Sequence, residues 1–75
     1  MIREHDSVAL TRDLSAEGLV KGDVGTVVHV YEGGAAYEVE FMNYEGETIV
    51  VTTLEAEAVR AVGMRDVPHV REVTA

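Results

Sequence analysis

The chain has 75 residues, no cysteine and a formal net charge of −8, with 14 acidic residues against six Lys and Arg. This length suits one small domain, and the lack of cysteine excludes disulfides and thiolate metal ligands. No run of residues approaches the ~18 apolar positions that a membrane span needs. We see no secretory signal at the N-terminus and expect a cytoplasmic protein without a membrane partner.

The acidic residues are concentrated in the middle of the chain. Between Gly22 and Val59 the sequence contains no lysine or arginine. A surface of one sign repels phosphate backbones and attracts cations, so we expect a basic protein partner, with solubility alone as the other explanation. The carboxylates of this window are Asp23, Glu32, Glu38, Glu40, Glu45, Glu47, Glu55 and Glu57.

The N-terminal part predicts a strand followed by a long loop. In SVALTR, Val8 and Leu10 alternate with Ala9 and Thr11, which is typical of a strand whose second pair faces solvent. The following loop, DLSAEGLVKGD, is bounded by aspartates and contains two glycines. The leucines of this loop, Leu14 and Leu19, are expected to fold back onto the core.

A hairpin is predicted next, from VGTVVHVY through the turn EGGAA to YEVEF. Gly25 within the first strand indicates a bulge or a sharp bend. We expect Glu38 and Glu40 to face solvent, because a shift of one residue would bury both carboxylates at a cost of several kcal/mol each. The side chains expected to face the core are Val28, Val30, Tyr37, Val39 and Phe41, and those expected to face outward in the first strand are Val27, His29 and Tyr31.

The rest of the domain predicts two more strands. NYEGE supplies a turn, and TIVVTT is a fourth strand with Ile49 and Val51 on one face. LEAEA suits one helical turn, and VRAV is the last strand. The sequence therefore predicts an all-β domain of five short strands with a short helical turn before the last one.

This order of elements is that of a small SH3-like barrel. The segment from Asp6 to Val30 resembles a KOW-type SH3 element: DSVAL opens a strand, Gly18 lies in the loop, and KGDVGTVVHV has the lysine, glycine and Gly-x-Val pattern. Over nearly the whole chain, GDVGTVVHVYEGGAAYEVEF and TLEAEAVRAV resemble a family of short uncharacterised bacterial proteins with this barrel, a domain of unknown function.

The resemblance implies a barrel over residues 1–62 and a C-terminal extension over 63–75. Some members of that family are thought to be encoded beside toxin genes, which implies an antitoxin or immunity role as one form of protein binding. KOW elements also contact RNA, so an RNA-binding accessory of translation or transcription is the alternative function. RNA phosphates require several basic residues, and Lys21 alone matches a basic position of the motif, so we expect no nucleic-acid partner.

No arrangement of residues predicts catalysis or a cofactor. Neither serine lies in a nucleophile elbow, and the glycines of GDVG and EGG have turn and bulge spacing, not that of a phosphate loop. His29 across from Glu38 and Glu40 is the one candidate metal site, and such a pair is more often an exposed cross-strand contact. We therefore predict a non-enzyme without metal or cofactor and keep the His29 site as an alternative. His69, near the C-terminus, is expected to be solvated.

The extension GMRDVPHVREVTA has a spacing of its own. Its valines recur every third residue after Asp66, a candidate N-cap, with Pro68 in the first turn, which predicts a short amphipathic helix. So short a helix must dock on its own barrel, on a second copy or on a partner. The leading prediction is a non-enzymatic protein-protein interaction module of unknown process. Its partner-binding residues are Glu38, Glu40, Glu45, Glu47, Val67, Val70 and Val73.

Overall fold

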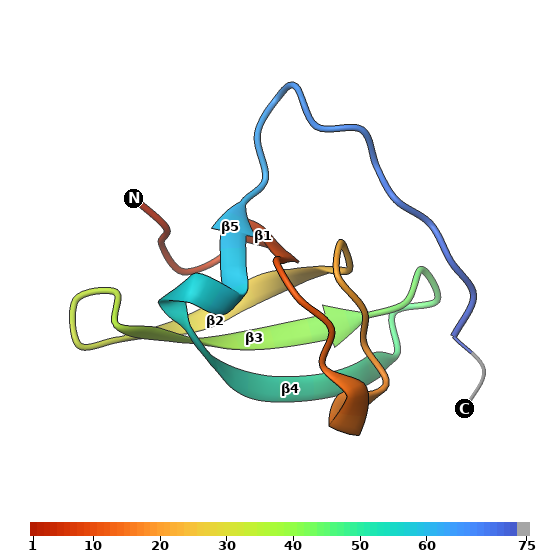
Figure 1. Cartoon of the computed structure of the whole chain (residues 1–75), viewed down its shortest axis with the longest axis horizontal. Helices are drawn as coiled ribbons and strands as arrows, with labels where there is room; N and C mark the ends of the chain where they lie inside the picture. The colour runs from red at the N-terminus through yellow and green to blue at the C-terminus, as the bar shows by residue number, and fades with distance from the viewer. Residues whose placement is uncertain (74–75) are drawn as a thin grey trace.

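The computed structural model describes residues 1–73; the last two residues of the predicted extension, Thr74 and Ala75, lie outside the described part. One antiparallel sheet of five strands makes up most of the fold (Figure 1). The strands are β1 (Ser7–Leu10), β2 (Val24–Tyr31), β3 (Ala36–Met42), β4 (Thr48–Glu55) and β5 (Val59–Ala61). Two 3₁₀ turns accompany them, η1 (Ser15–Glu17) in the first loop and η2 (Ala56–Ala58) directly before β5. The predicted all-β class, the five strands and the helical turn are confirmed.

The strands follow the order β4-β3-β2-β1-β5, so β4 and β5 form the two edges of the sheet. Pairing joins β1 to β2 and β5, and β3 to β2 and β4. Within residues 1–73 no ladder connects β4 to β5. The sheet is therefore open, and the predicted closed barrel is not confirmed.

The core lies on one face of the sheet. Alternation on β3 places Tyr37, Val39 and Phe41 inside, at 6%, 0% and 3% exposure, as predicted. Leu19 is buried and Leu14 packs against the core, which confirms that the first loop folds back. The remaining buried members of the cluster are Val8, Leu10, Val27, Leu54, Ala58 and Val59.

The predicted orientations on β2 are wrong at Val27 and Val28. The register passes from the pair Val27↔Val39 to the pair His29↔Glu38, so Val28 has no partner and forms a bulge. Alternation resets at that point. Val27 is fully buried and Val28 is 40% exposed, whereas Val30 packs against the core as expected.

Gly25 lies close to β3. The bulge that the sequence predicted at Gly25 occurs three residues later, at Val28. A Cβ at Gly25 would come within 2.6 Å of Val39 Cγ1 and within 2.9 Å of the Glu40 carbonyl oxygen and Phe41 Cε2. Glycine is therefore required at this position by the approach of β3, since any side chain would overlap it.

Ala9 was expected on the solvent side of β1, but it is 4% exposed. β1 lies between β2 and β5, and its second face borders a hollow that Val67 and His69 also line. Ala9 is paired with Val24 on one side and Arg60 on the other, and the C-terminal segment lies across the hollow from it.

Residues 62–73, here called the strap, contain no helix and no strand. The strap arches away from the end of β5 and descends beside the β3–β4 turn (Figure 1). Asp66 closes a turn, because its carboxylate accepts the Gly63 amide at 2.6 Å and pairs with Arg60 at 3.0 Å. The predicted helix after Asp66 is therefore wrong for the described residues. No helix among residues 1–73 is long and apolar enough to cross a membrane.

Candidate interaction surface

Glu38 and Glu40 lie on the outer face of the sheet, the face of β2, β3 and β4 opposite to the core. Both side chains are half-buried. The Glu38 carboxylate accepts hydrogen bonds from the hydroxyls of Tyr31 and Thr53, and Glu40 accepts one from Thr48 at 2.6 Å. Within residues 1–73 no Lys or Arg forms an ion pair with either glutamate. Hydroxyl donors hold these carboxylates in place without neutralising their charge.

His29 lies across from Glu38 in the ladder, as predicted, but its ring contacts Glu4 and Tyr31 and not Glu38 or Glu40. Its Nδ1 is 3.7 Å from Glu4 Oε2, and the ring meets that of Tyr31 edge-on at 4.4 Å. Among the described residues no group of three or more His, Asp or Glu side chains could hold a metal ion. The structure does not bring His29, Glu38 and Glu40 together as ligands.

Glu45 and Glu47 lie in the turn between β3 and β4. Asn43 organises this turn: its Oδ1 accepts the amides of Glu45 and Glu47 at 3.0 and 2.9 Å, and its Nδ2 donates to Glu47 Oε1 at 2.8 Å. Gly46 follows with a φ of 86°, a left-handed conformation that suits glycine. Both carboxylates are exposed at the end of the sheet.

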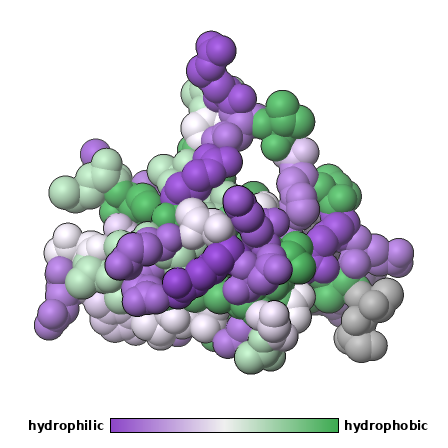
Figure 2. Space-filling model, in the orientation of Figure 1, coloured by the Kyte–Doolittle hydropathy of each residue, from purple (hydrophilic) through white to green (hydrophobic). Residues whose placement is uncertain are grey.

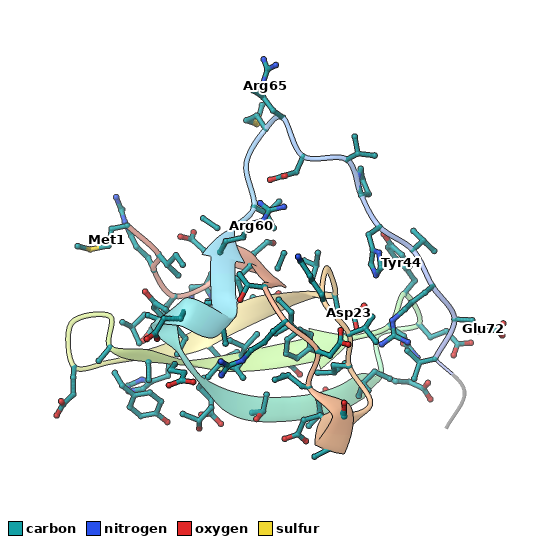
Figure 3. The ribbon with its side chains drawn as sticks, in the orientation of Figure 1. Met1, Asp23, Tyr44, Arg60, Arg65 and Glu72 are labelled. Atoms are coloured by element: carbon teal, nitrogen blue, oxygen red, sulfur yellow. The ribbon has the colours of Figure 1, made fainter. Side chains whose placement is uncertain are left out.

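A groove separates this turn from the strap. Val70 and Val73 line it from the strap, and Glu45 and Ile49 line it from the turn and the start of β4. Figure 3 shows Tyr44 beside the descending part of the strap, to which Glu72 belongs. Three of the seven predicted partner-binding residues, namely Glu45, Val70 and Val73, thus meet in one groove.

The other predicted residues lie elsewhere. Val67 is 86% exposed and borders the separate hollow beside Ala9, while Glu38 and Glu40 belong to the outer face. Hydrophobic and hydrophilic residues are interspersed along the strap, which stands away from the body of the molecule at its crest (Figure 2). Glu38 and Glu40 therefore share the outer face and Glu45, Val70 and Val73 share the groove, whereas Glu47 and Val67 belong to neither.

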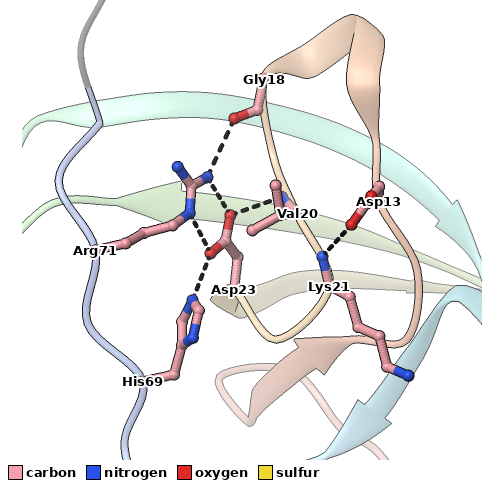
Figure 4. Close-up of polar contacts among 7 residues, drawn as sticks. All are labelled: Asp13, Gly18, Val20, Lys21, Asp23, His69 and Arg71. Carbon is pink, nitrogen blue, oxygen red and sulfur yellow. Dashed lines mark hydrogen bonds and ion pairs between the residues drawn. The ribbon is translucent and has the colours of Figure 1, made fainter.

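A cluster that we call the latch, formed by Asp23, His69 and Arg71, holds the strap (Figure 4). Asp23 Oδ1 contacts His69 Nε2 at 2.9 Å and accepts Arg71 Nε at 2.8 Å. Asp23 Oδ2 accepts the Val20 amide at 2.9 Å and a second bond from Arg71 Nη2. Arg71 Nη2 also donates to the Gly18 carbonyl at 3.1 Å. His69 is exposed, as expected, with 40% of its side chain accessible, but its Nε2 also contacts Asp23, which the sequence did not predict.

Asp23 is 8% exposed and is the buried charged side chain of residues 1–73. Burial by itself would raise the pKa of its carboxyl group. The hydrogen bonds from Arg71, the Val20 amide and His69, together with the charge on Arg71, outweigh burial and lower the pKa from 3.8 to about 2. The bidentate geometry of Arg71 suits a carboxylate and keeps it ionised.

The latch makes the free energy of unfolding decrease as the pH becomes acidic. Because the pKa of Asp23 is lower in the folded state, its contribution is complete above about 3.8 and is lost as pH falls through about 2. The shift corresponds to roughly 2 kcal/mol. Between about pH 5 and about pH 1, we expect the free energy of unfolding in urea to fall by roughly that much more in the wild type than in Asp23→Asn. Equal losses in the two proteins would contradict a depressed Asp23 pKa.

Sequence reasoning missed the latch, although one signal was present. In HVREV the basic residues His69 and Arg71 are two apart, with Val70 between them. In an extended chain such residues share one side, whereas in a helix they do not. A period of two would have placed His69 and Arg71 together against an acidic partner, but it could not have identified that partner as Asp23.

Comparison with known proteins locates this domain in a family. The family model for a domain of unknown function, DUF4926, matches residues 4–61. No curated protein and no solved structure matches the chain. The matched range holds all five strands and Asp23, and it ends before the strap with His69 and Arg71. The chain therefore belongs to the DUF4926 family, whose function is unknown.

Proposed function

We propose that this protein is a non-enzymatic interaction module that binds a basic protein through the acidic outer face of its sheet. The observation that carries the proposal is the pair Glu38 and Glu40, which share that face without a Lys or Arg partner among residues 1–73. A cationic partner would supply the missing counter-charge and would be steered to this face. A toxin-neutralising protein is one concrete form of such a module.

The groove supplies apolar contact beside the acidic face. Val70 and Val73 are 74% and 41% exposed, and a partner that covered them would gain the free energy of burying apolar surface. Charge would then govern the association rate and apolar burial the lifetime of the complex. Val67 lies further along the same strap and would extend this contact.

We also propose that the sheet is an open variant of the SH3-like barrel. The strand order β4-β3-β2-β1-β5, with a 3₁₀ turn directly before β5, supports this relation. The fold relation by itself does not favour RNA binding, because fold does not transmit function. With a net charge of −8, the surface opposes phosphate contacts.

Reversing the charge of the outer face tests the proposal. The partner is first captured from native lysate at low salt on immobilised wild-type protein, and its association is then measured with the purified proteins. Glu38→Lys with Glu40→Lys should leave the circular dichroism spectrum unchanged and slow association about tenfold at low salt, since steering depends on the field of the surface. The difference should shrink as salt is added.

A second double variant controls for net charge. Glu32 lies at the tip of the β2–β3 hairpin and Glu57 in η2, and both are exposed. Glu32→Lys with Glu57→Lys changes the total charge equally but leaves the outer face intact, so we expect less than about a twofold change in rate. Equal slowing in both variants would remove the outer face from the mechanism. Capture of RNA with no protein would reject the proposal in favour of the RNA-binding alternative.

A further inference from the structure

Among residues 1–73, β4 is a long edge strand that pairs on one side alone. It has eight residues and a ladder to β3, whereas β5, the opposite edge, has three residues. From Phe41↔Val50 to Ala36↔Glu55 the β3–β4 ladder runs through six consecutive pairs without a bulge. The outer side of β4 therefore presents a straight, regular stretch of backbone.

The direction of the unpaired backbone groups follows from the ladder. The Ala56 amide donates to the Ala35 carbonyl, so the backbone of Ala56 points toward β3. In an antiparallel pair the direction alternates with each residue, so the N–H and C=O groups of Val51, Thr53 and Glu55 point away from β3. Beyond the β3 ladder, no backbone hydrogen bond within residues 1–73 involves a residue of β4. These groups face the open edge.

The edge lacks two of the features with which proteins protect such strands, lysine and proline, although the first loop reaches it through Arg12 and Glu17. Thr48–Glu55 contains no lysine and no proline, and its single irregularity lies at the Met42 end. Val51 and Thr53 are exposed, whereas Glu38 and Glu40, on the same face of the neighbouring strand, are half-buried. A β-branched edge of this length, without lysine or proline, is a template for pairing with another strand.

We propose that the β4 edge binds an extended, cationic segment of the partner by strand addition, a mode of binding that rests on the proposed function above. Backbone hydrogen bonds to Val51, Thr53 and Glu55 would provide the pairing. Acidic groups lie along the edge, because Glu40 contacts Thr48 at its start and Glu17 Oε2 lies 3.4 Å from Thr52 Oγ1 in its middle. Glu55 stands at its far end, where Arg12 pairs with it.

A second copy of the chain fits this edge poorly. An antiparallel pair of β4 strands would bring the carboxylates around Glu55 and Glu40 of one copy close to those of the other, and Arg12 would offset Glu55 alone. Each copy carries a net charge of −8. A strand of alternating cationic and apolar residues would instead place positive charge beside the acidic outer face.

Amide hydrogen exchange with a model peptide tests the proposal. The probe is a capped peptide of eight residues, the length of β4, that alternates lysine and valine. At about ten times its Kd the peptide should slow exchange at Val51, Thr53 and Glu55 about tenfold, since protection scales as one plus the ratio of ligand to Kd. Val50, Thr52 and Leu54 point toward β3 and serve as internal controls that should change little.

Two matched probes separate strand addition from charge alone. The same peptide with a methyl group on every backbone amide nitrogen keeps its charge but has no N–H to donate and carries methyl groups along both edges, so it cannot pair and should not protect the β4 edge. In the protein, Val51→Pro removes one outward N–H without touching the β3 ladder, and it should weaken peptide binding about tenfold, whereas Val51→Thr should not. Circular dichroism tests whether Val51→Pro is folded. If the variant is unfolded, the N-methylated peptide distinguishes strand addition from binding by charge alone.

The outcomes distinguish this inference from the proposed function. Binding of the lysine peptide that depends on Glu38 and Glu40 but leaves exchange at Val51, Thr53 and Glu55 unchanged would overturn strand addition and keep the acidic face. No binding of the lysine peptide at millimolar concentration would overturn strand addition. Protection that rises with protein concentration in the absence of peptide would also overturn it, because a second copy would then occupy the edge.

Discussion

Replacing Gly25 with alanine is expected to lower the free energy of unfolding by roughly 3 kcal/mol. The new Cβ would overlap Val39 Cγ1, the Glu40 carbonyl oxygen and Phe41 Cε2 at 2.6 to 2.9 Å. The carbonyl belongs to the β2–β3 ladder and cannot turn away without breaking it, so the two strands must separate. A domain of this size has a total stability of roughly 4 to 11 kcal/mol, so the variant should be close to unfolding at moderate temperature.

Gly63→Ala is the matched control for this prediction. Gly63 lies in the strap, its φ is not positive, and the nearest atom to an added Cβ is Asp66 Oδ2 at 3.7 Å. We expect its free energy of unfolding to rise by less than about 1 kcal/mol, because alanine restricts the unfolded chain. Urea denaturation of both variants measures the difference, and comparable losses would contradict the close approach of β3 to Gly25.

Asp23→Ala is expected to lower the free energy of unfolding by roughly 2 kcal/mol and to release the strap from the sheet. The substitution removes the acceptor of Arg71, His69 and the Val20 amide together. Loss of one member of a buried pair costs about 3 to 5 kcal/mol, and the cost here is smaller because the Arg71 and His69 side chains are 28% and 40% exposed and can regain water. Without Asp23, the described side-chain hydrogen bonds of the strap are those of the Asp66 turn and the one from Arg71 to the Gly18 carbonyl.

Nuclear magnetic resonance can separate release of the strap from general unfolding. In Asp23→Ala, the amide resonances of residues 66–73 should move toward random-coil positions, while those of β3 and β4 remain dispersed. Arg65→Ala is the control: Arg65 points into solvent at the crest of the strap (Figure 3), and its side chain has no described hydrogen bond or ion pair. A strap that stays ordered in Asp23→Ala would show that the latch is not what holds it.

Release of the strap would also dismantle the groove. Val70 and Val73 line the groove from the strap, and His69 and Arg71, on either side of Val70, hold the strap against Asp23. Asp23→Ala should therefore reduce the apolar part of partner binding while leaving Glu38 and Glu40 in place. The complex would then dissociate faster with little change in its association rate, because the charge of the outer face is intact.

The positions of the strands were predictable because local patterns carry them. On β3, strict alternation makes one face apolar, and any other register would bury Glu38 and Glu40. The placement of these glutamates on an exposed face followed from the same pattern. The bulge at Val28 was not predictable, since VVHV contains no interruption and the extra residue is absorbed by the ladder to β3.

The C-terminal segment was misread for a different reason. The spacing of Val67, Val70 and Val73 favours a helix when the segment is considered alone. In the folded protein, Asp23 binds His69 and Arg71 from the same side, and this is compatible with extended chain. Asp23 is 46 positions from His69 and 48 from Arg71 in the sequence, and these long-range contacts outweigh the local preference for a helix.

By itself the sequence determined the all-β class, the five strands, the faces of β3 and the acidic character of the middle of the chain. These features depend on residues close together in the chain, whose alternation and charge act locally. Tertiary structure alone decided that the sheet stays open at β4, that Val28 bulges, that Gly25 meets β3 and that the strap is tied to Asp23. Each of these features depends on which distant segments of the chain come into contact. The packing of the whole core and the ion pair between Asp23 and Arg71 determine those contacts.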